Sequence, residues 1–223
     1  MNKIKIIVSN EILAACPEFH FSAICCRVKN SPYSEELWKE IDTFSADFRS
    51  RYKMEDIAQR EAIFATRQAY KNLGKDPSRY RPSAEALCRR IIKDVKLYQI
   101  DTLVDLINLV SLKTGYSIGG FDAGKIQGNL VLGVGTAGEK FEAIGRGLLN
   151  IEGLPVYRDD IGGIGTPTSD EERTKITAVT TRLLMIINGY SGKEGLQEAT
   201  DYSVELLKKY AEAEEINLSA TKS

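Results

Sequence analysis

The stretch that decides the fold class is residues 101–122, DTLVDLINLVSLKTGYSIGGFD. Asp101 has the short polar side chain of a helix N-cap, and Gly115 suits the end of a helix. Between them, one face repeats at helical spacing and carries Leu103, Leu106, Ile107, Val110 and Thr114. We therefore expect a helix over residues 102–114, followed by glycine-rich backbone that cannot continue it.

The chain after this helix has a different texture. Residues 115–165 contain 14 of the 18 glycines, and no long helix fits between them. The pattern predicts short strands and tight turns, with strands near residues 129–134, 140–144 and 155–158. Residues 182–187 are expected to form a buried strand.

The flanking segments are richer in helices. Strands are expected at residues 4–8 and 21–28, and a helix beginning at Ser31-Pro32 has an apolar stripe. Further helices are expected over about residues 54–73, after an N-cap at Ser83, and over about residues 194–214. Residues 216–223 are expected to be a frayed tail. Helices at both ends around a β-rich centre indicate the α+β class.

Composition sets limits on function. With 223 residues, 43% of them hydrophobic and 27% charged, the chain suits one globular domain, or one domain with an appendage. A net charge of −1 excludes a generally basic nucleic-acid coat, and a single histidine excludes His-rich zinc sites. No apolar run is long enough for a secretory signal or a membrane span. We expect a cytoplasmic protein with no metal and no cofactor. The sequence has no CxxC motif, and we expect its four cysteines to be reduced thiols: Cys16, Cys25, Cys26 and Cys88.

Charge is nevertheless uneven along the chain. Residues 79–96 carry a net charge of +4, and residues 194–215 carry −5. Both segments can be interpreted as solvated helix faces. The basic segment has a second interpretation, as a patch that faces RNA phosphates. The candidate RNA-binding residues are Arg79, Arg81, Arg89, Arg90 and Lys93.

The sequence contains one misleading motif. Gly133, Gly135 and Gly138 match GxGxxG after an expected strand. A dinucleotide site requires a helix to begin there, so that its amides meet the pyrophosphate, but Gly145, Gly147 and Pro155 would interrupt such a helix. A glycine-rich β-turn is the favoured interpretation, and a nucleotide-dependent enzyme remains a minor alternative.

Residues 157–175, YRDDIGGIGTPTSDEERTK, form a polar, glycine-rich segment too long for a simple connection. Loops of this kind line sites, and this one supplies charge and hydrogen bonds through Asp159, Asp160, Thr166, Asp170, Arg173 and Thr174. The alternative is a structural loop in which Asp170 caps a helix and Arg173 forms a salt bridge.

Two further polar features are ambiguous. Asp105 and Asn108 lie on one side of the expected 102–114 helix, where the amide either bonds a loop or faces a pocket. His20, near the beginning of the chain, is interpreted as a satisfied or exposed side chain rather than a catalytic one.

An ordered series of motifs resembles a known family. The series comprises RPSAEAL at residues 81–87, VDLINLVSLKTG at 104–115, GFD at 120–122, KIQG at 125–128 and the Asp170 to Thr174 segment. It resembles the B3/B4 editing module of the bacterial phenylalanyl-tRNA synthetase beta subunit, and free-standing proteins built on that module. The resemblance covers roughly residues 60–190.

The resemblance implies a three-layer α+β fold with an unusual β-sandwich and flanking helices. It also implies tRNA or aminoacyl-tRNA as partner, without the synthetase body. In the synthetase, the module hydrolyses tRNA mischarged with tyrosine. Such hydrolysis needs a positioned water and donors for the oxyanion. Backbone amides of Gly119, Gly120, Gly162 and Gly163 are expected donors.

Of the side chains in the synthetase pattern, only Asn108 and the Phe121-Asp122 pair carry over. Together with the polar 157–175 segment, they form the candidate site of an editing-type domain. Asn108, Asp160 and Asp170 are expected to be catalytic. The expected substrate-binding residues are Ser111, Gly119, Gly120, Asp122, Asp159, Thr166, Arg173 and Thr174. Where the synthetase pattern has Thr and His, this chain has Ile107 and Gly119, so specificity for tyrosine is not carried over.

The expected organisation is an N-terminal extension (1–60) packed on the same domain, an editing-like domain (61–215) and the tail. The favoured function is a tRNA-binding, editing-type domain that hydrolyses aminoacyl-tRNA in trans. The alternative is a non-catalytic module whose pocket binds a free amino acid or small metabolite. Both depend on a small cavity between the central helix and the late acidic turn.

Overall fold

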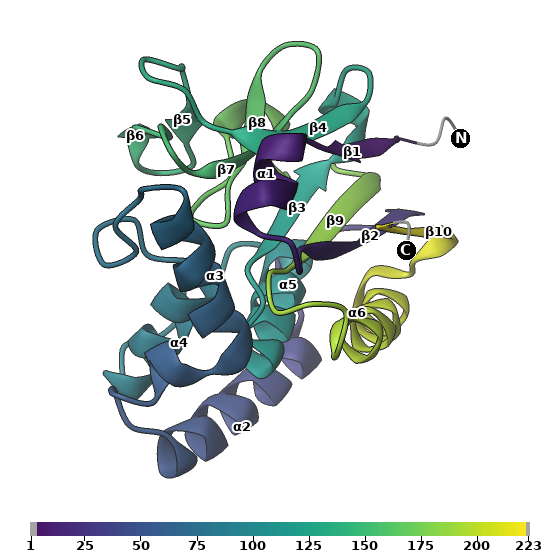
Figure 1. The fold of residues 1–223 in the computed structure, drawn as a ribbon. Coiled ribbons are helices and arrows are strands. Elements are labelled where there is room, and N and C mark those ends of the chain that lie inside the picture. Colours follow the sequence, from purple (N-terminus) through teal and green to yellow (C-terminus); the bar gives the residue numbers. More distant parts are fainter. Residues whose placement is uncertain (1–3, 222–223) are drawn as a thin grey trace.

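The computed structural model describes residues 4–221, which form two four-stranded sheets flanked by helices (Figure 1). The first sheet contains, in spatial order, β1 (Ile6–Val8), β4 (Leu130–Val134), β7 (Pro155–Arg158) and β8 (Gly163–Gly165). The second contains β10 (Glu214–Ala220), β2 (His20–Arg27), β9 (Arg182–Gly189) and β3 (Ile118–Asp122). A small hairpin pairs β5 (Glu142–Ala143) with β6 (Gly147–Leu148).

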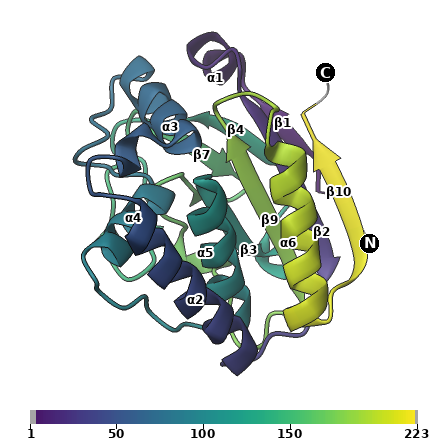
Figure 2. The same ribbon diagram turned by 90° about the horizontal axis from the view of Figure 1, so that it is seen from below.

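The helices are α1 (Asn10–Ala15), α2 (Glu35–Arg51), α3 (Glu61–Asn72), α4 (Ser83–Ile92), α5 (Thr102–Thr114) and α6 (Leu196–Ala211). Three short 3₁₀ turns cover Ile57–Gln59, Ala123–Lys125 and Glu172–Thr174. In Figure 2, α5 and α6 lie across one face of the second sheet, and α2 lies beyond α5.

Strand β9 explains why the domain has three layers. Successive side chains of a strand point to opposite faces. Leu184 and Ile186 pack between the sheets with Leu132 of β4, whereas Leu183 and Met185 pack against α5 and α6. A strand buried on both faces reads as an uninterrupted apolar run. The expected α+β fold with a β-sandwich and flanking helices is confirmed.

Several expected elements need correction. The helix expected over residues 54–73 is broken, because Arg60 has extended backbone and α3 begins only at Glu61. The helix expected to begin at Ser31-Pro32 begins at Glu35, where the Ser34 side chain accepts from the Leu37 N–H. Ser83 is the first residue of α4 rather than its cap, which is Pro82.

The expectation of a frayed tail from residue 216 is wrong for residues 216–220. These residues belong to β10, which pairs antiparallel with β2, from Asn217 opposite Cys25 to Ala220 opposite Ser22. Most β10 side chains are exposed, so the segment has no buried apolar pattern to reveal it. The remainder of the expected tail, residues 222–223, lies outside the described residues.

Two smaller expectations are confirmed. The GxGxxG segment leaves β4 through a turn, and no helix forms between it and β7, so it is not a dinucleotide loop. The four cysteines are free thiols. In residues 4–221, no helix is long and apolar enough to cross a membrane.

Candidate functional site

A pocket of about 360 Å³ lies between α5, the start of α4, β3 and the loop that follows β8. We call it the Asn108–Asp170 pocket. Its apolar wall is formed by Leu87, Ile100, Val104, Ile107, Ile118, Ile144 and Ile176. Its polar lining is formed by Ser83, Asn108, Ser111, Thr166, Ser169, Asp170 and Lys175, together with the backbone of Gly120. A mostly apolar pocket with a few polar groups is the usual form of a small-molecule site.

Helix α5 presents two polar side chains to this pocket. Its beginning is fixed by Asp101, which accepts from the Val104 N–H at 3.0 Å, and its end by Gly115 with φ of 85°. Asn108 and Ser111 are one turn apart and therefore share a face. Neither side chain has a hydrogen-bond partner within residues 4–221, although Ser111 is only 2% exposed. Both groups are thus free to bind a ligand.

Asp170 supplies the carboxyl group of the pocket. Its Oδ2 accepts from the Gly120 N–H at 3.1 Å. Burial raises the pKa of the Asp170 carboxyl to about 7, and the Gly120 N–H offsets only part of that effect. The neighbouring cation, Lys175, is paired with Glu172 instead. Asp170 therefore changes charge near neutral pH.

Glycines leave the space that this carboxyl occupies. A Cβ on Gly165 would lie 2.8 Å from Asp170 Oδ1 and 2.6 Å from the Phe121 ring. A Cβ on Gly120 would lie 2.7 Å from Ile107 Cδ1. Side chains at these two positions would fill the pocket or displace its carboxyl group.

The pocket brings together only part of the residue set expected from sequence. It contains Asn108, Ser111, Gly120, Thr166 and Asp170. It does not contain Gly119, Asp122, Asp159, Asp160, Arg173 or Thr174. The Thr166 hydroxyl is already used within its loop, where it donates to the Ser169 carbonyl at 3.0 Å.

Asp159 and Arg173 form a buried pair outside the pocket. The guanidinium donates to the two carboxylate oxygens at 2.9 and 3.0 Å. Although burial raises the pKa of Asp159, Arg173 and the N–H groups of Gln127, Ile161 and Gly162 lower it overall. The salt bridge of the structural-loop alternative is therefore present, and the Gly162 amide is used by Asp159.

The remaining members of the set lie elsewhere. Asp122 accepts from the Thr180 hydroxyl at 2.9 Å and from the Gly124 N–H at 2.9 Å. Asp160 is exposed, and Thr174 is fully buried with a hydroxyl that has no partner among the described residues. A Cβ on Gly119 would meet the Phe121 ring at 2.7 Å.

Asp105 and Asn108 have different roles despite their shared helix. Asp105 is 1% exposed and accepts from Trp38 Nε1 at 2.7 Å and from the Ile100 N–H at 3.2 Å. Burial raises the pKa of Asp105 to about 6, although these two donors lower it. Asp105 thus fastens α2 and the 93–101 loop to α5, whereas Asn108 faces the pocket.

The basic segment at residues 79–96 surrounds a buried carboxylate. Glu85 is fully buried, and its nearest cations are Arg67 at 2.8 Å, Arg89 at 2.7 Å and Arg81 at 3.5 Å. Two of the candidate RNA-binding arginines, Arg81 and Arg89, are therefore paired with a buried carboxylate, although part of each side chain remains exposed. The others, Arg79, Arg90 and Lys93, form no ion pair with a described residue.

Sequence reasoning missed most of the pocket wall. Val104 could have been found, because Val104, Ile107, Asn108 and Ser111 follow the i, i+3, i+4, i+7 spacing of one helix face. Ile118, Ile144 and Ile176 carry no such signal, since an isoleucine that lines a pocket and one in the core look alike in a sequence. Lys175 and Ser83 also line the pocket and were not among the residues expected from the sequence.

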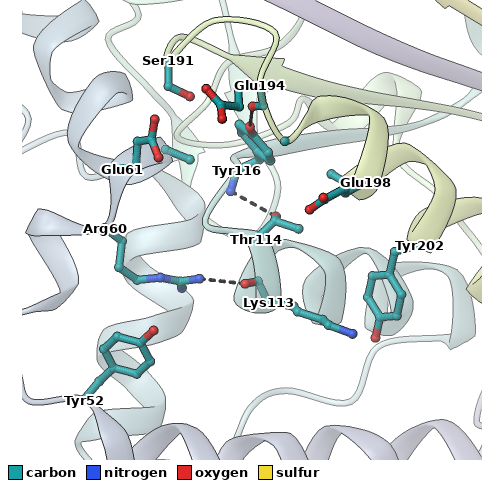
Figure 3. Close-up of a pocket in the computed structure, with 13 residues that line it drawn as sticks. Tyr52, Arg60, Glu61, Lys113, Thr114, Tyr116, Ser191, Glu194, Glu198 and Tyr202 are labelled. Carbon is teal, nitrogen blue, oxygen red and sulfur yellow. Dashed lines mark hydrogen bonds between the residues drawn. The ribbon is translucent and has the colours of Figure 1, made fainter.

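A second, more open groove of about 630 Å³ lies at the C-terminal end of α5 (Figure 3). Glu61, Glu194 and Glu198 surround Tyr116, whose hydroxyl donates to the Glu194 carbonyl at 2.9 Å. The Arg60 guanidinium donates to the Leu112 and Lys113 carbonyls at 2.8 Å and so caps α5. The groove contains none of the residues expected at a site, and these contacts have structural roles.

The fold and the pocket define a class of protein, a β-sandwich with one sheet covered by helices and a partly apolar pocket at the edge of the helical layer. The chain belongs to the B3/4 domain family, which matches residues 65–212.

The fold is also similar to a solved structure, an N-terminal fragment of the phenylalanyl-tRNA synthetase beta subunit from Pyrococcus horikoshii. The TM-score is 0.52 at 14% sequence identity, and the match covers 100% of this chain and 55% of that chain. This chain therefore spans about half the length of that fragment. The search of curated proteins found no match.

Proposed function

We propose that the Asn108–Asp170 pocket binds the aminoacyl group of a charged tRNA and that the chain hydrolyses the ester in trans. The observation that carries this proposal is the meeting of two side chains without a hydrogen-bond partner among the described residues, Asn108 and Ser111, with a carboxyl group that has no paired cation there, Asp170, in one pocket. The similarity to a fragment of a phenylalanyl-tRNA synthetase supports tRNA as the carrier of the aminoacyl group.

The chemistry needs a base and an oxyanion donor. Ionised Asp170 accepts a proton from a water molecule whose oxygen attacks the ester carbonyl. The bond between the carbonyl carbon and the ribose oxygen then breaks, and the ribose oxygen takes up the proton. A pKa of about 7 suits a general base that works near neutral pH. The free Asn108 amide donates to the oxyanion as it forms.

The test is a deacylation assay over a panel of tRNAs charged with different amino acids. We expect Asn108→Ala to lower the rate by about 10²-fold, as loss of an oxyanion donor does. Asp170→Asn should lower it by about 10²-fold or more and remove the rise in rate as the pH passes 7. Asp160→Asn, a matched change at an exposed carboxyl outside the pocket, serves as the control. Absence of deacylation for every charged tRNA would exclude the hydrolytic role.

A non-catalytic pocket for a free amino acid is the second candidate. It is favoured by the engagement of Arg81 and Arg89 with buried Glu85, which reduces the charge available to a polyanion. Ile107 and Gly119 at the positions of the family Thr and His favour it too. A thermal-shift screen with amino acids separates the candidates, because a free ligand that binds the folded state raises the melting temperature. Stabilisation by an amino acid without tRNA binding selects this candidate.

A further inference from the structure

The connection between α4 and α5, residues 93–101, has an unusual surface. It contains three exposed large apolar side chains within six residues: Val95 at 43%, Tyr98 at 68% and Ile100 at 56% exposure. Apolar groups gathered on an exposed segment mark an interaction site more often than scattered ones do. The same segment carries the exposed Lys93 and Lys96.

The Tyr98 ring is held in place by an arginine. The Arg90 guanidinium lies 4.1 Å from the ring centroid, and its Nε donates to the Lys96 carbonyl at 2.6 Å. The segment is also tied at Asp94, which pairs with Arg49 and has a positive φ of 55°. One face of an aromatic ring is thus covered by a cation while the side chain remains largely exposed.

A hollow of about 690 Å³ lies beside this ring, between the segment and α2. Trp38, Ile91 and Leu97 contribute apolar surface to it, and Tyr98 and Lys96 border it. The charged residues that line the hollow are balanced, with Asp42 and Asp94 against Arg49 and Lys96. The cationic excess lies along the chain beside the ring, because residues 90–98 contain Arg90, Lys93 and Lys96 and one acid, Asp94, which is paired with Arg49. This excess favours an anionic partner.

The segment also leads to the Asn108–Asp170 pocket. Ile100 lines that pocket, and two residues of extended chain span about 7 Å from Tyr98. The Cα atoms of Tyr98 and the pocket residue Ile100 are therefore at most about 7 Å apart.

We infer that Tyr98, backed by Arg90, is a stacking platform for an unpaired base of a single-stranded RNA end, with Lys93 and Lys96 facing its phosphates. Aromatic rings in a positively charged setting bind unpaired bases in this way, because every base has a π face. This inference rests on the proposed function, since it places the terminal nucleotides beside the pocket that receives the aminoacyl group.

The test measures the binding of a fluorescent single-stranded RNA ending in CCA by anisotropy. Tyr98→Ala is expected to weaken binding at least about fivefold, as loss of base stacking does. Tyr98→Phe retains the ring and should bind as the parent does. Leu218→Ala removes an exposed apolar side chain on β10, at the edge of the second sheet opposite β3, and should also bind as the parent does. Lys96→Gln should weaken binding and reduce its salt dependence.

The inference is overturned if the RNA does not bind, if Tyr98→Ala binds like the parent, or if Leu218→Ala loses as much affinity. The deacylation assay separates its failure from that of the proposed function. If charged tRNA is hydrolysed and Tyr98→Ala does not change the rate, the stacking role of Tyr98 is contradicted and the proposed function is retained. If RNA binding depends on Tyr98 but the protein hydrolyses no charged tRNA, the stacking role is supported and the hydrolytic role is contradicted.

Discussion

Asp170 supplies the carboxyl group of the Asn108–Asp170 pocket, and no cation among the described residues pairs with it. The folded-state pKa of about 7 exceeds the ordinary value of 3.8. The folded state therefore retains the proton more strongly than the unfolded state does. The contribution of Asp170 to the stability of the folded state is fully present below pH 3.8 and is lost as the pH rises through 7.

Asp170→Asn should accordingly change how stability depends on pH. The amide carries no charge and its oxygen still accepts from the Gly120 N–H. As the pH rises from 4 to 8, the unfolding free energy of the variant should increase by about 2 kcal/mol relative to that of the parent. This is about half of what the full pKa shift of Asp170 implies, since the side chain keeps access to the pocket. Urea denaturation at several pH values measures this difference. Parallel pH profiles for parent and variant would contradict the assigned pKa.

Sequence alone could select these residues as a group but could not rank them. Asp159, Asp160 and Asp170 lie in one polar loop and are chemically identical. The fold pairs Asp159 with Arg173, leaves Asp160 in solvent and directs Asp170 into the pocket. Their separation depends on contacts with β3 and with residues 125–127, which no local pattern encodes.

At the scale of elements, α5 determines where the pocket polar groups lie. Its N-cap is Asp101, which is 5% exposed and bonded to the Val104 N–H. Loss of such a cap costs about 1 kcal/mol. Asp101→Ala should therefore lower the unfolding free energy by about 1–2 kcal/mol, the upper value reflecting burial of the cap. Chemical denaturation measures this loss. As a control, Glu205→Ala on the exposed face of α6 should change the unfolding free energy by less than about 0.5 kcal/mol.

The elements that could be predicted are those with a strong pattern and clear ends. Helix α5 has its cap, its apolar face and its terminal glycine in the sequence, and the structure places it at residues 102–114 as expected. The break before α3 was missed because Arg60 is not a helix breaker by type. Its backbone is non-helical, with φ of −58° and ψ of 128°, and its guanidinium bonds the last carbonyls of α5, a contact between distant segments.

At the scale of the whole molecule, β10 completes the second sheet by covering the outer edge of β2. Deletion of residues 214–223 would expose the backbone N–H and C=O groups of β2, and exposed edges promote association between chains. The shortened protein should melt at a lower temperature and scatter more light on heating. An unchanged melting temperature would show that β10 adds nothing to the stability of the sheet.

The position of β2 between β10 and β9 has a consequence for synthesis. Residues 20–27 pair with residues 182–189 and 214–220, so this strand leaves the ribosome long before either neighbour exists. Contacts between such distant segments slow folding. Until then, a strand with two unpaired edges and two adjacent thiols is exposed to other nascent chains, and unpaired strand edges promote association between chains.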